Sequence, residues 1–192
     1  MKNIIRILAK IYFCYLKYRV RQFNTEYING TEKCIICPNH SNKDDPAWIL
    51  SSIKNTYAMA KLSLFKNKFY SIILHYLNTL PVKNNQINSI RNAIKLLENN
   101  KNIKLLIFIE KTRIARKKGE LGFGAIYLAC KLNVPIIPVY ITENVNKFSK
   151  VNIIYGKPIY YDKNLLENKQ KQQEAADNLL NTIYSLKNES TL

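Results

Sequence analysis

The sequence predicts an α/β fold: a single domain with a largely parallel, mixed sheet flanked by helices. Three observations support this prediction. The chain has 192 residues, of which 47% are hydrophobic, which suits one domain with a substantial core. Short apolar segments alternate with longer amphipathic ones, the order typical of parallel α/β domains. Neither an internal repeat nor a Gly/Ser-rich linker divides the chain.

The first 22 residues predict an amphipathic helix, and every charged residue among them is basic. On a helical wheel of about 100° per residue, most of these cations share one arc and Ile and Tyr side chains cover much of the remainder. An apolar face beside a basic stripe is typical of a helix lying in a membrane interface. We therefore assign residues 1–25 as a membrane-docking helix and 26–192 as the α/β domain; the alternative is a terminal helix packed on the domain. The predicted membrane-binding residues are Lys2, Arg6, Lys10, Lys17 and Arg21.

The rest of the chain supplies the predicted sheet and its covering helices. Short segments rich in β-branched or aromatic residues predict strands. They lie at 33–38, 56–60, 79–82, 104–108, 134–141 and 151–155. Helices are expected between and after them, the first opening with Pro46, which suits a first helical turn. They lie at 46–53, 62–77, 88–99, 121–132 and 165–186.

The charge balance points to an anionic partner. The chain has 30 Lys and Arg against 13 Asp and Glu, a formal net charge of +17. Such an excess favours either nucleic acid or acidic lipid headgroups. No nucleic-acid-binding motif is present, so we expect an anionic membrane surface and no nucleic acid.

Four cysteines are too few for a disulfide scaffold at this length, so a reduced intracellular protein is expected. Cys34 and Cys37 form a Cys-x-x-Cys pair, which raises the alternative of a zinc site. No second pair follows, and both cysteines lie in an apolar predicted strand, where unpaired cysteine is commonly buried. We interpret them as structural.

The loop at 39–45 carries the residues of a general base. His40 and Asp45 are five residues apart, between a predicted strand and a predicted helix. A carboxylate beside a histidine fixes its tautomer and stabilises the imidazolium form, which suits a base near neutral pH. The alternative is structural, with His40 capping the loop and Asp45 capping the helix.

A second loop, which begins at Glu110, carries the residues of a phosphate site. Thr112 supplies a hydroxyl donor, and Arg113 can bind a phosphate through two parallel hydrogen bonds. A solvated basic loop is the alternative interpretation.

These loops, in this order, resemble the glycerolipid acyltransferase family, typified by 1-acylglycerol-3-phosphate (lysophosphatidic acid) acyltransferase. Four family motifs have counterparts here, the third with Lys111 where the family has glycine, and a Gly-Lys-Pro-Ile segment at 156–159 also recurs. The motifs are His40-x-x-x-x-Asp45, Leu80-Pro81-Val82-Lys83, Phe108-Ile109-Glu110-Lys111-Thr112-Arg113 and Val-Pro-Ile-Ile-Pro-Val at 134–139. An Ala60-Lys61 pair also matches the family pattern.

The resemblance implies transfer of a fatty acyl group from a thioester to the hydroxyl of lysophosphatidic acid, giving phosphatidic acid. In this scheme His40 is the catalytic base and Asp45 orients it. The acceptor phosphate would be held by Lys61, Lys83, Glu110, Thr112 and Arg113. The resemblance implies no metal and no cofactor, with acyl-CoA or acyl-carrier protein as the donor substrate. It also implies a peripheral protein on the cytoplasmic face of a membrane.

Three alternatives remain open from the sequence. The least favoured is a nucleic-acid binder, which the net charge of +17 would suit. The chain could use another lysophospholipid or glycerol 3-phosphate as acceptor. It could also be a catalytically weak member of the family that binds membrane lipid, which the altered loop around Lys111 would favour.

Overall fold

Seven strands of the described residues form one twisted sheet in the order β1-β7-β6-β2-β5-β3-β4. The structure is a computed structural model and describes residues 2–82, 86–110 and 121–191. Neighbouring strands are parallel except β6 and β7, which are antiparallel. The strands are β1 (Arg19–Phe23), β2 (Lys33–Pro38), β3 (Thr56–Lys61), β4 (Thr79–Val82), β5 (Ile103–Leu106), β6 (Ile136–Ile141) and β7 (Lys150–Tyr155). The predicted fold class is confirmed.

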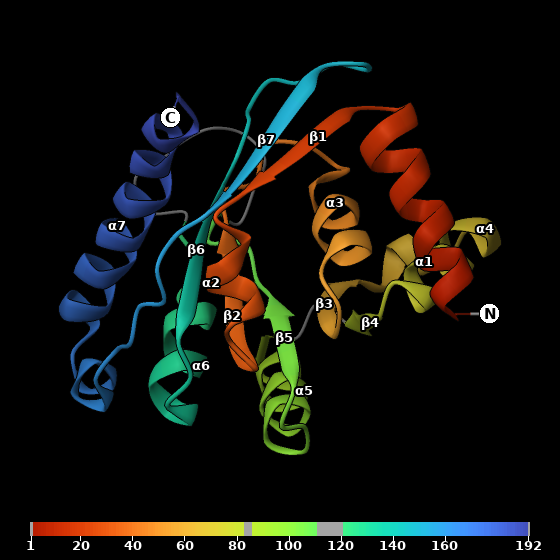
Figure 1. Cartoon of the computed structure of the whole chain (residues 1–192). Helices are drawn as coiled ribbons and strands as arrows, with labels where there is room; N and C mark the ends of the chain where they lie inside the picture. The colour runs from red at the N-terminus through yellow and green to blue at the C-terminus, as the bar shows by residue number, and fades with distance from the viewer. Residues whose placement is uncertain (1, 83–85, 111–120, 192) are drawn as a thin grey trace.

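Helices cover both faces of the sheet (Figure 1). Buried residues of α1 and α3, with partly buried Ile73 of α4, share one core with one sheet face, and buried residues of α5, α6 and α7 share a second core with the other face. The helices are α1 (Lys2–Lys10), α2 (Thr25–Asn29), α3 (Asp45–Ser52), α4 (Lys68–Tyr76), α5 (Gln86–Glu98), α6 (Gly124–Leu132) and α7 (Lys169–Ser185). A π-helical segment, η1 (Ile11–Leu16), continues α1, and short 3₁₀ segments lie at Leu62–Phe65, Lys163–Glu167 and Leu186–Thr191.

Strand β2 lies in the middle of the sheet and is buried from both sides. Its side chains alternate between the two cores, as the period of a strand requires: Ile35 and Cys37 face one, Cys34 and Ile36 the other. The two cysteines therefore point to opposite faces and cannot share one metal ion. Burial raises the pKa of Cys34 to about 12 and also raises the pKa of Cys37. Both thiols are unpaired and buried, as interpreted from the sequence.

The expected helix over 1–22 is wrong beyond its first two-thirds. Helical structure ends at Leu16, and Arg19–Phe23 forms the edge strand β1, parallel to β7 and paired from Arg19 with Lys150 to Phe23 with Ile154. The predicted docking unit 1–25 is thus a helical segment followed by a strand of the domain, and Arg21 lies on that strand. Alternating exposed and half-buried side chains at 19–21 fit a half-covered edge strand.

Two other predicted helices begin or divide differently. The segment predicted at 62–77 is a 3₁₀ turn followed by α4, which starts at Lys68. The last helix starts at Lys169 instead of 165, because the Asn168 side chain accepts hydrogen bonds from the backbone N–H groups of Gln170 and Lys171 and so caps it there.

Candidate active site

The loop after β2 brings together the two residues predicted to act as a general base. His40 lies two residues beyond the end of β2, and Asp45 is the first residue of α3. His40 Nδ1 lies 3.0 Å from Asp45 Oδ2, and the Asp45 side chain is fully buried while that of His40 is 15% exposed. With Nδ1–H donating to the carboxylate, the neutral ring presents its lone pair on Nε2. The pair is therefore arranged as a base with its orienting acid.

The Asp45 carboxylate also holds the backbone of the loop. Oδ2 accepts hydrogen bonds from the N–H groups of Ser41 and Asn42, both at 2.9 Å, in addition to the His40 ring. Asp44, not Asp45, occupies the N-cap position of α3, and no side chain caps the helix there. Asp45 therefore points away from the helix and into the loop, which argues against the alternative in which it is a helix cap.

Glu110 fixes the His40 backbone from the other side. Its Oε2 accepts a hydrogen bond of 2.7 Å from the His40 N–H. Burial raises the pKa of the Glu110 carboxyl, and the hydrogen bonds from His40 N–H and from Tyr184 partly offset that rise. The Phe108 ring packs on the His40 imidazole with centroids 4.1 Å apart. Two residues of the segment that follows β5 thus orient the histidine.

Two further positioning residues were not predicted from the sequence. Asn39 is fully buried, and its side chain amide donates to the Ile141 carbonyl at 2.9 Å and accepts from the Ile141 N–H at 2.7 Å. These two hydrogen bonds tie the start of the loop to the end of β6. Tyr184 of α7 places its hydroxyl 3.4 Å from Glu110 Oε1 and 3.3 Å from Glu143 Oε1. The position of Asn39 directly before His40 could have indicated its role from the sequence. Nothing in the sequence indicates Tyr184.

The residues predicted to bind phosphate are only partly described. Lys61 is the last residue of β3 and pairs in register with Val82, which directly precedes Lys83. Glu110 lies beside His40, as given above. Lys83, Thr112 and Arg113 lie outside the described residues. Because β3, β5 and β2 run parallel, Lys61, Glu110 and His40 follow strand ends at the same edge of the sheet.

A comparison with protein-family models matches residues 19–142 to the model described as Acyltransferase. The match covers β1 to β6 and therefore includes His40, Asp45 and Glu110. The chain belongs to the acyltransferase family. The family resemblance stated from the motifs is thereby confirmed.

This acyltransferase also has a solved structural relative. The 1-acyl-sn-glycerophosphate (LPA) acyltransferase PlsC from Thermotoga maritima superimposes with a TM-score of 0.72 at 21% sequence identity. The alignment covers all of this chain and 80% of that one. The likeness therefore confirms the fold. No curated protein sequence matches the chain significantly.

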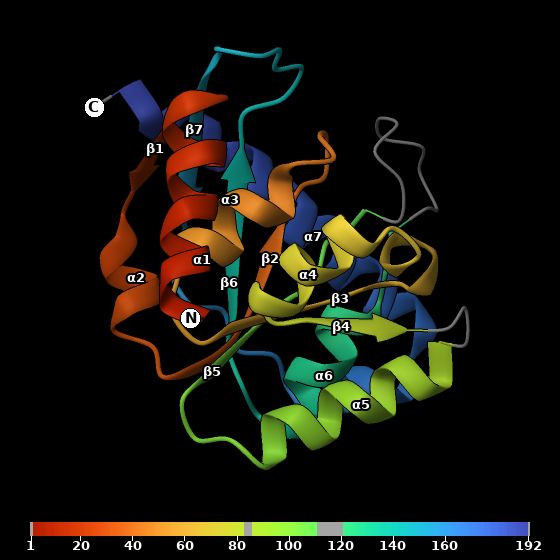
Figure 2. The same ribbon diagram turned by 90° about the vertical axis from the view of Figure 1, so that its right-hand side faces the viewer.

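The N-terminal helical segment of the acyltransferase directs apolar side chains outward. We call this surface the docking face, after the membrane docking expected from the sequence; the exposed fraction of its members ranges from 42% to 61%. Its members are Ile4, Ile7, Leu8, Ile11, Tyr12, Tyr15 and Leu16. Exposed Leu62, Leu64 and Ile72 lie on or just before α4, which packs beside α1 (Figure 2). Among the described helices, none is long and apolar enough to cross a bilayer.

Two cations of the predicted basic stripe bond groups of the domain. Arg6 is half-buried and donates from Nε to the Ser51 carbonyl of α3 at 3.3 Å, and burial lowers its pKa. Lys17 Nζ lies 2.6 Å from Asp44 Oδ2, which also accepts from the Tyr18 hydroxyl. Both cations face the protein because they bond acceptors on α3 and in the loop at 39–45. Lys2 begins α1 and Arg21 is exposed on β1.

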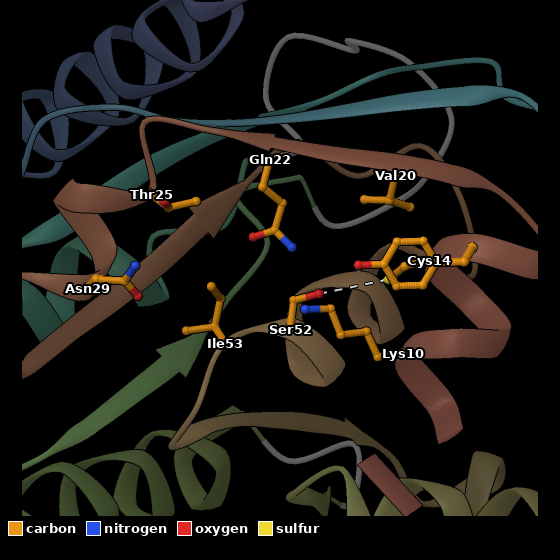
Figure 3. Close-up of a pocket in the computed structure, with 9 residues that line it drawn as sticks. Lys10, Cys14, Val20, Gln22, Thr25, Asn29, Ser52 and Ile53 are labelled. Atoms are coloured by element: carbon orange, nitrogen blue, oxygen red, sulfur yellow. Dashed lines mark hydrogen bonds between the residues drawn. The ribbon is translucent and has the colours of Figure 1, made fainter. Parts of the chain in front are cut away.

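Lys10 lines a polar hollow of about 330 Å³ behind this segment. Cys14, Gln22 and Ser52 contribute from η1, β1 and α3, and Cys14 Sγ lies 3.8 Å from Ser52 Oγ (Figure 3). The hollow does not include His40 or Asp45. Lys10 is therefore a third cation of the predicted stripe that borders the domain.

Proposed function

We propose that this acyltransferase transfers a fatty acyl group from an acyl thioester to the free hydroxyl of 1-acylglycerol 3-phosphate, giving phosphatidic acid. The observation that carries the proposal is the contact between His40 Nδ1 and a fully buried Asp45 carboxylate at the carboxyl edge of the sheet. The name of the structural relative, a 1-acyl-sn-glycerophosphate acyltransferase, supports the choice of acceptor.

In the proposed mechanism His40 acts directly on the acceptor. Its Nε2 takes the proton from the glycerol hydroxyl as the oxygen attacks the thioester carbonyl. The C–S bond of the tetrahedral intermediate then breaks, and the departing thiolate takes the proton from the imidazolium. The new ester and a neutral thiol leave, and His40 returns to its starting state. Asp45 stabilises the imidazolium during the cycle, and its two backbone hydrogen bonds keep the carboxylate in place.

We propose that the acceptor phosphate binds beside this pair. Lys61, Lys83, Thr112 and Arg113 supply cations and a hydroxyl donor, which is the chemistry a phosphate needs. Glu110, assigned with them, contributes by holding the His40 backbone, since its carboxylate accepts that N–H at 2.7 Å. The acyl donor is acyl-CoA or acyl-carrier protein, and the reaction requires no metal or cofactor.

We further propose that the protein lies peripherally on an anionic membrane, on its cytoplasmic side. The docking face presents seven large apolar side chains to solvent, a surface that an interfacial location would cover. Both substrates carry acyl chains, so this location lets them reach His40 without crossing water.

The test is acyl transfer from labelled acyl-CoA and acyl-carrier protein to a panel of acceptors in mixed micelles. The panel contains lysophosphatidic acid, other lysophospholipids and glycerol 3-phosphate. We expect transfer to lysophosphatidic acid that His40→Ala reduces by at least about a hundredfold. Preference for another acceptor would overturn the substrate assignment. Vesicle binding by folded protein without any transfer would favour a catalytically weak lipid-binding member of the family.

A further inference from the structure

The connection between β6 and β7 carries an exposed aromatic residue on a strained backbone. Phe148 is 60% exposed and has a φ of 70°. The other non-glycine residues at positive φ in the described part of the chain are all asparagines, which tolerate this conformation. A bulky residue rarely adopts it, and burial does not compensate Phe148. The exposed ring gains little from burial in the fold to offset this backbone cost, which points to a partner outside it.

This tip is fixed beside the end of the docking face. The Phe148 N–H donates to the Lys17 carbonyl at 2.8 Å, and the Arg19 N–H donates to the Ser149 carbonyl at 2.9 Å. Lys17 itself is anchored to Asp44. Figures 1 and 2 both show the β6–β7 connection next to the end of the N-terminal helical segment that leads into β1. Two backbone hydrogen bonds therefore hold the tip beside the end of the docking face.

The same end of the molecule concentrates positive charge. Arg19 and Lys150 are register partners on parallel strands, and both are exposed. Lys147 Nζ lies 4.9 Å from the centroid of the Phe148 ring. Residues 1–25 and 144–155 contain no Asp or Glu. Like charges on paired residues repel each other, and a bound anion would relieve that repulsion. This surface therefore fits an anionic partner.

We propose that the tip is a second membrane contact: Phe148 inserts into the headgroup region of an anionic bilayer, and Lys147, Arg19 and Lys150 bind lipid phosphates. The inference rests on the proposed docking of the N-terminal segment. A single helix on a bilayer can still rotate about its long axis. A second contact beside its end removes that freedom and fixes how the carboxyl edge of the sheet, with His40, faces the lipid.

The first test compares Phe148→Asn with the wild-type full chain on vesicles of phosphatidylglycerol and phosphatidylcholine. Loss of one inserted aromatic ring weakens binding by roughly tenfold. Asparagine accepts the left-handed backbone, so Tm stays the same or rises, whereas a residue kept for the fold would lower Tm when removed. Lys147→Gln weakens binding by roughly fivefold, the contribution of one cation near an anionic surface.

The matched control is Tyr160→Asn. Tyr160 is 68% exposed, and its neighbour Ile159 pairs with Ile136. Ile136 is the first residue of β6, whereas the tip follows the last residue of that strand. This variant leaves vesicle binding unchanged.

The second test places a fluorescent probe at each position. Trp48 is the only tryptophan in the chain and is fully buried. The indole introduced by Phe148→Trp is quenched by brominated lipids and that of Tyr160→Trp is not.

Three results would overturn the inference, and each identifies a different reason for its failure. Unquenched fluorescence from Phe148→Trp, with wild-type binding by Phe148→Asn, would refute the tip contact and leave docking of the helix intact. A wild-type chain that does not bind anionic vesicles would refute the docking and the tip together. Unchanged vesicle binding by Phe148→Asn, with slower transfer from acyl-carrier protein but not from acyl-CoA, would show that the surface takes the carrier protein.

Discussion

Asp45→Asn separates the proposed catalytic role of Asp45 from its contribution to the stability of the loop at 39–45. Asparagine has the size of aspartate and keeps one acceptor oxygen for the Ser41 and Asn42 N–H groups, which lie 2.9 Å from Oδ2. A hydrogen bond to a charged acceptor contributes ~1.5–3 kcal/mol and one to a neutral acceptor ~0.5–1.5 kcal/mol. The neutral side chain also removes the cost of burying a charge. We therefore expect the free energy of unfolding to fall by only about 1–2 kcal/mol.

The effect of Asp45→Asn on turnover should be much larger. The amide cannot stabilise the imidazolium and can hold the ring in the wrong tautomer. General-base catalysis contributes about 10²–10⁴ in rate, so kcat should drop at least about a hundredfold. Thiol release from acyl-CoA measures kcat, and urea unfolding measures the stability. Because Asp45 acts through His40, adding Asp45→Asn to His40→Ala should cost no further activity.

The control for this experiment is the same substitution one residue earlier. Asp44 is equally part of the loop, but its carboxylate bonds Lys17 and Tyr18 instead of His40. Asp44→Asn should lower the stability by about 1–3 kcal/mol while kcat stays within a few-fold of wild type. If Asp45→Asn is folded and turns over like Asp44→Asn, the proposed role of Asp45 is refuted.

Three further predictions concern the surroundings of His40. Burial holds the Glu110 pKa above 4.5 in the folded chain, so its contribution to stability is present below 4.5 and is lost as the pH rises through the folded value. Unfolding titrations should show this loss in wild type and not in Glu110→Gln; parallel curves would contradict it. Asn39→Ala leaves the buried N–H and C=O of Ile141 without their partners, and urea unfolding should show a loss of about 2–4 kcal/mol; wild-type stability would contradict the clamp. Arg113→Ala should raise the acceptor KM at least about tenfold if it binds phosphate, with the donor KM as control; an unchanged acceptor KM would place the phosphate elsewhere.

The sequence predicted the contact between His40 and Asp45 well because the two residues are close along the chain. His40 and Asp45 lie five residues apart, and a strand followed by a helix was enough to bring them together. The buried strand β2 was recognisable from its run of apolar residues, and it lies in the centre of the sheet. In such cases the pattern within one short segment determines the structure.

The parts that the sequence did not predict depend on distant partners. Strand β1 forms against β7, more than a hundred residues away, so its five residues resembled a continuation of the helix. Lys17 turns inward because Asp44 lies opposite it, and helical periodicity cannot indicate such a partner. The Tyr184 hydroxyl reaches Glu110 only after α7 packs on the domain. The alternation of Arg19, Val20 and Arg21 is the one local signal that favoured a strand.

We propose that His40, oriented by Asp45, catalyses acyl transfer to lysophosphatidic acid. The most direct measurement is the rate of phosphatidic acid formation from labelled acyl-CoA or acyl-carrier protein, with wild type and His40→Ala compared on the same anionic vesicles. We expect product from wild type and at least about a hundredfold less from the folded variant. Equal rates for the two proteins, or no product from vesicle-bound wild type with either donor, would contradict it.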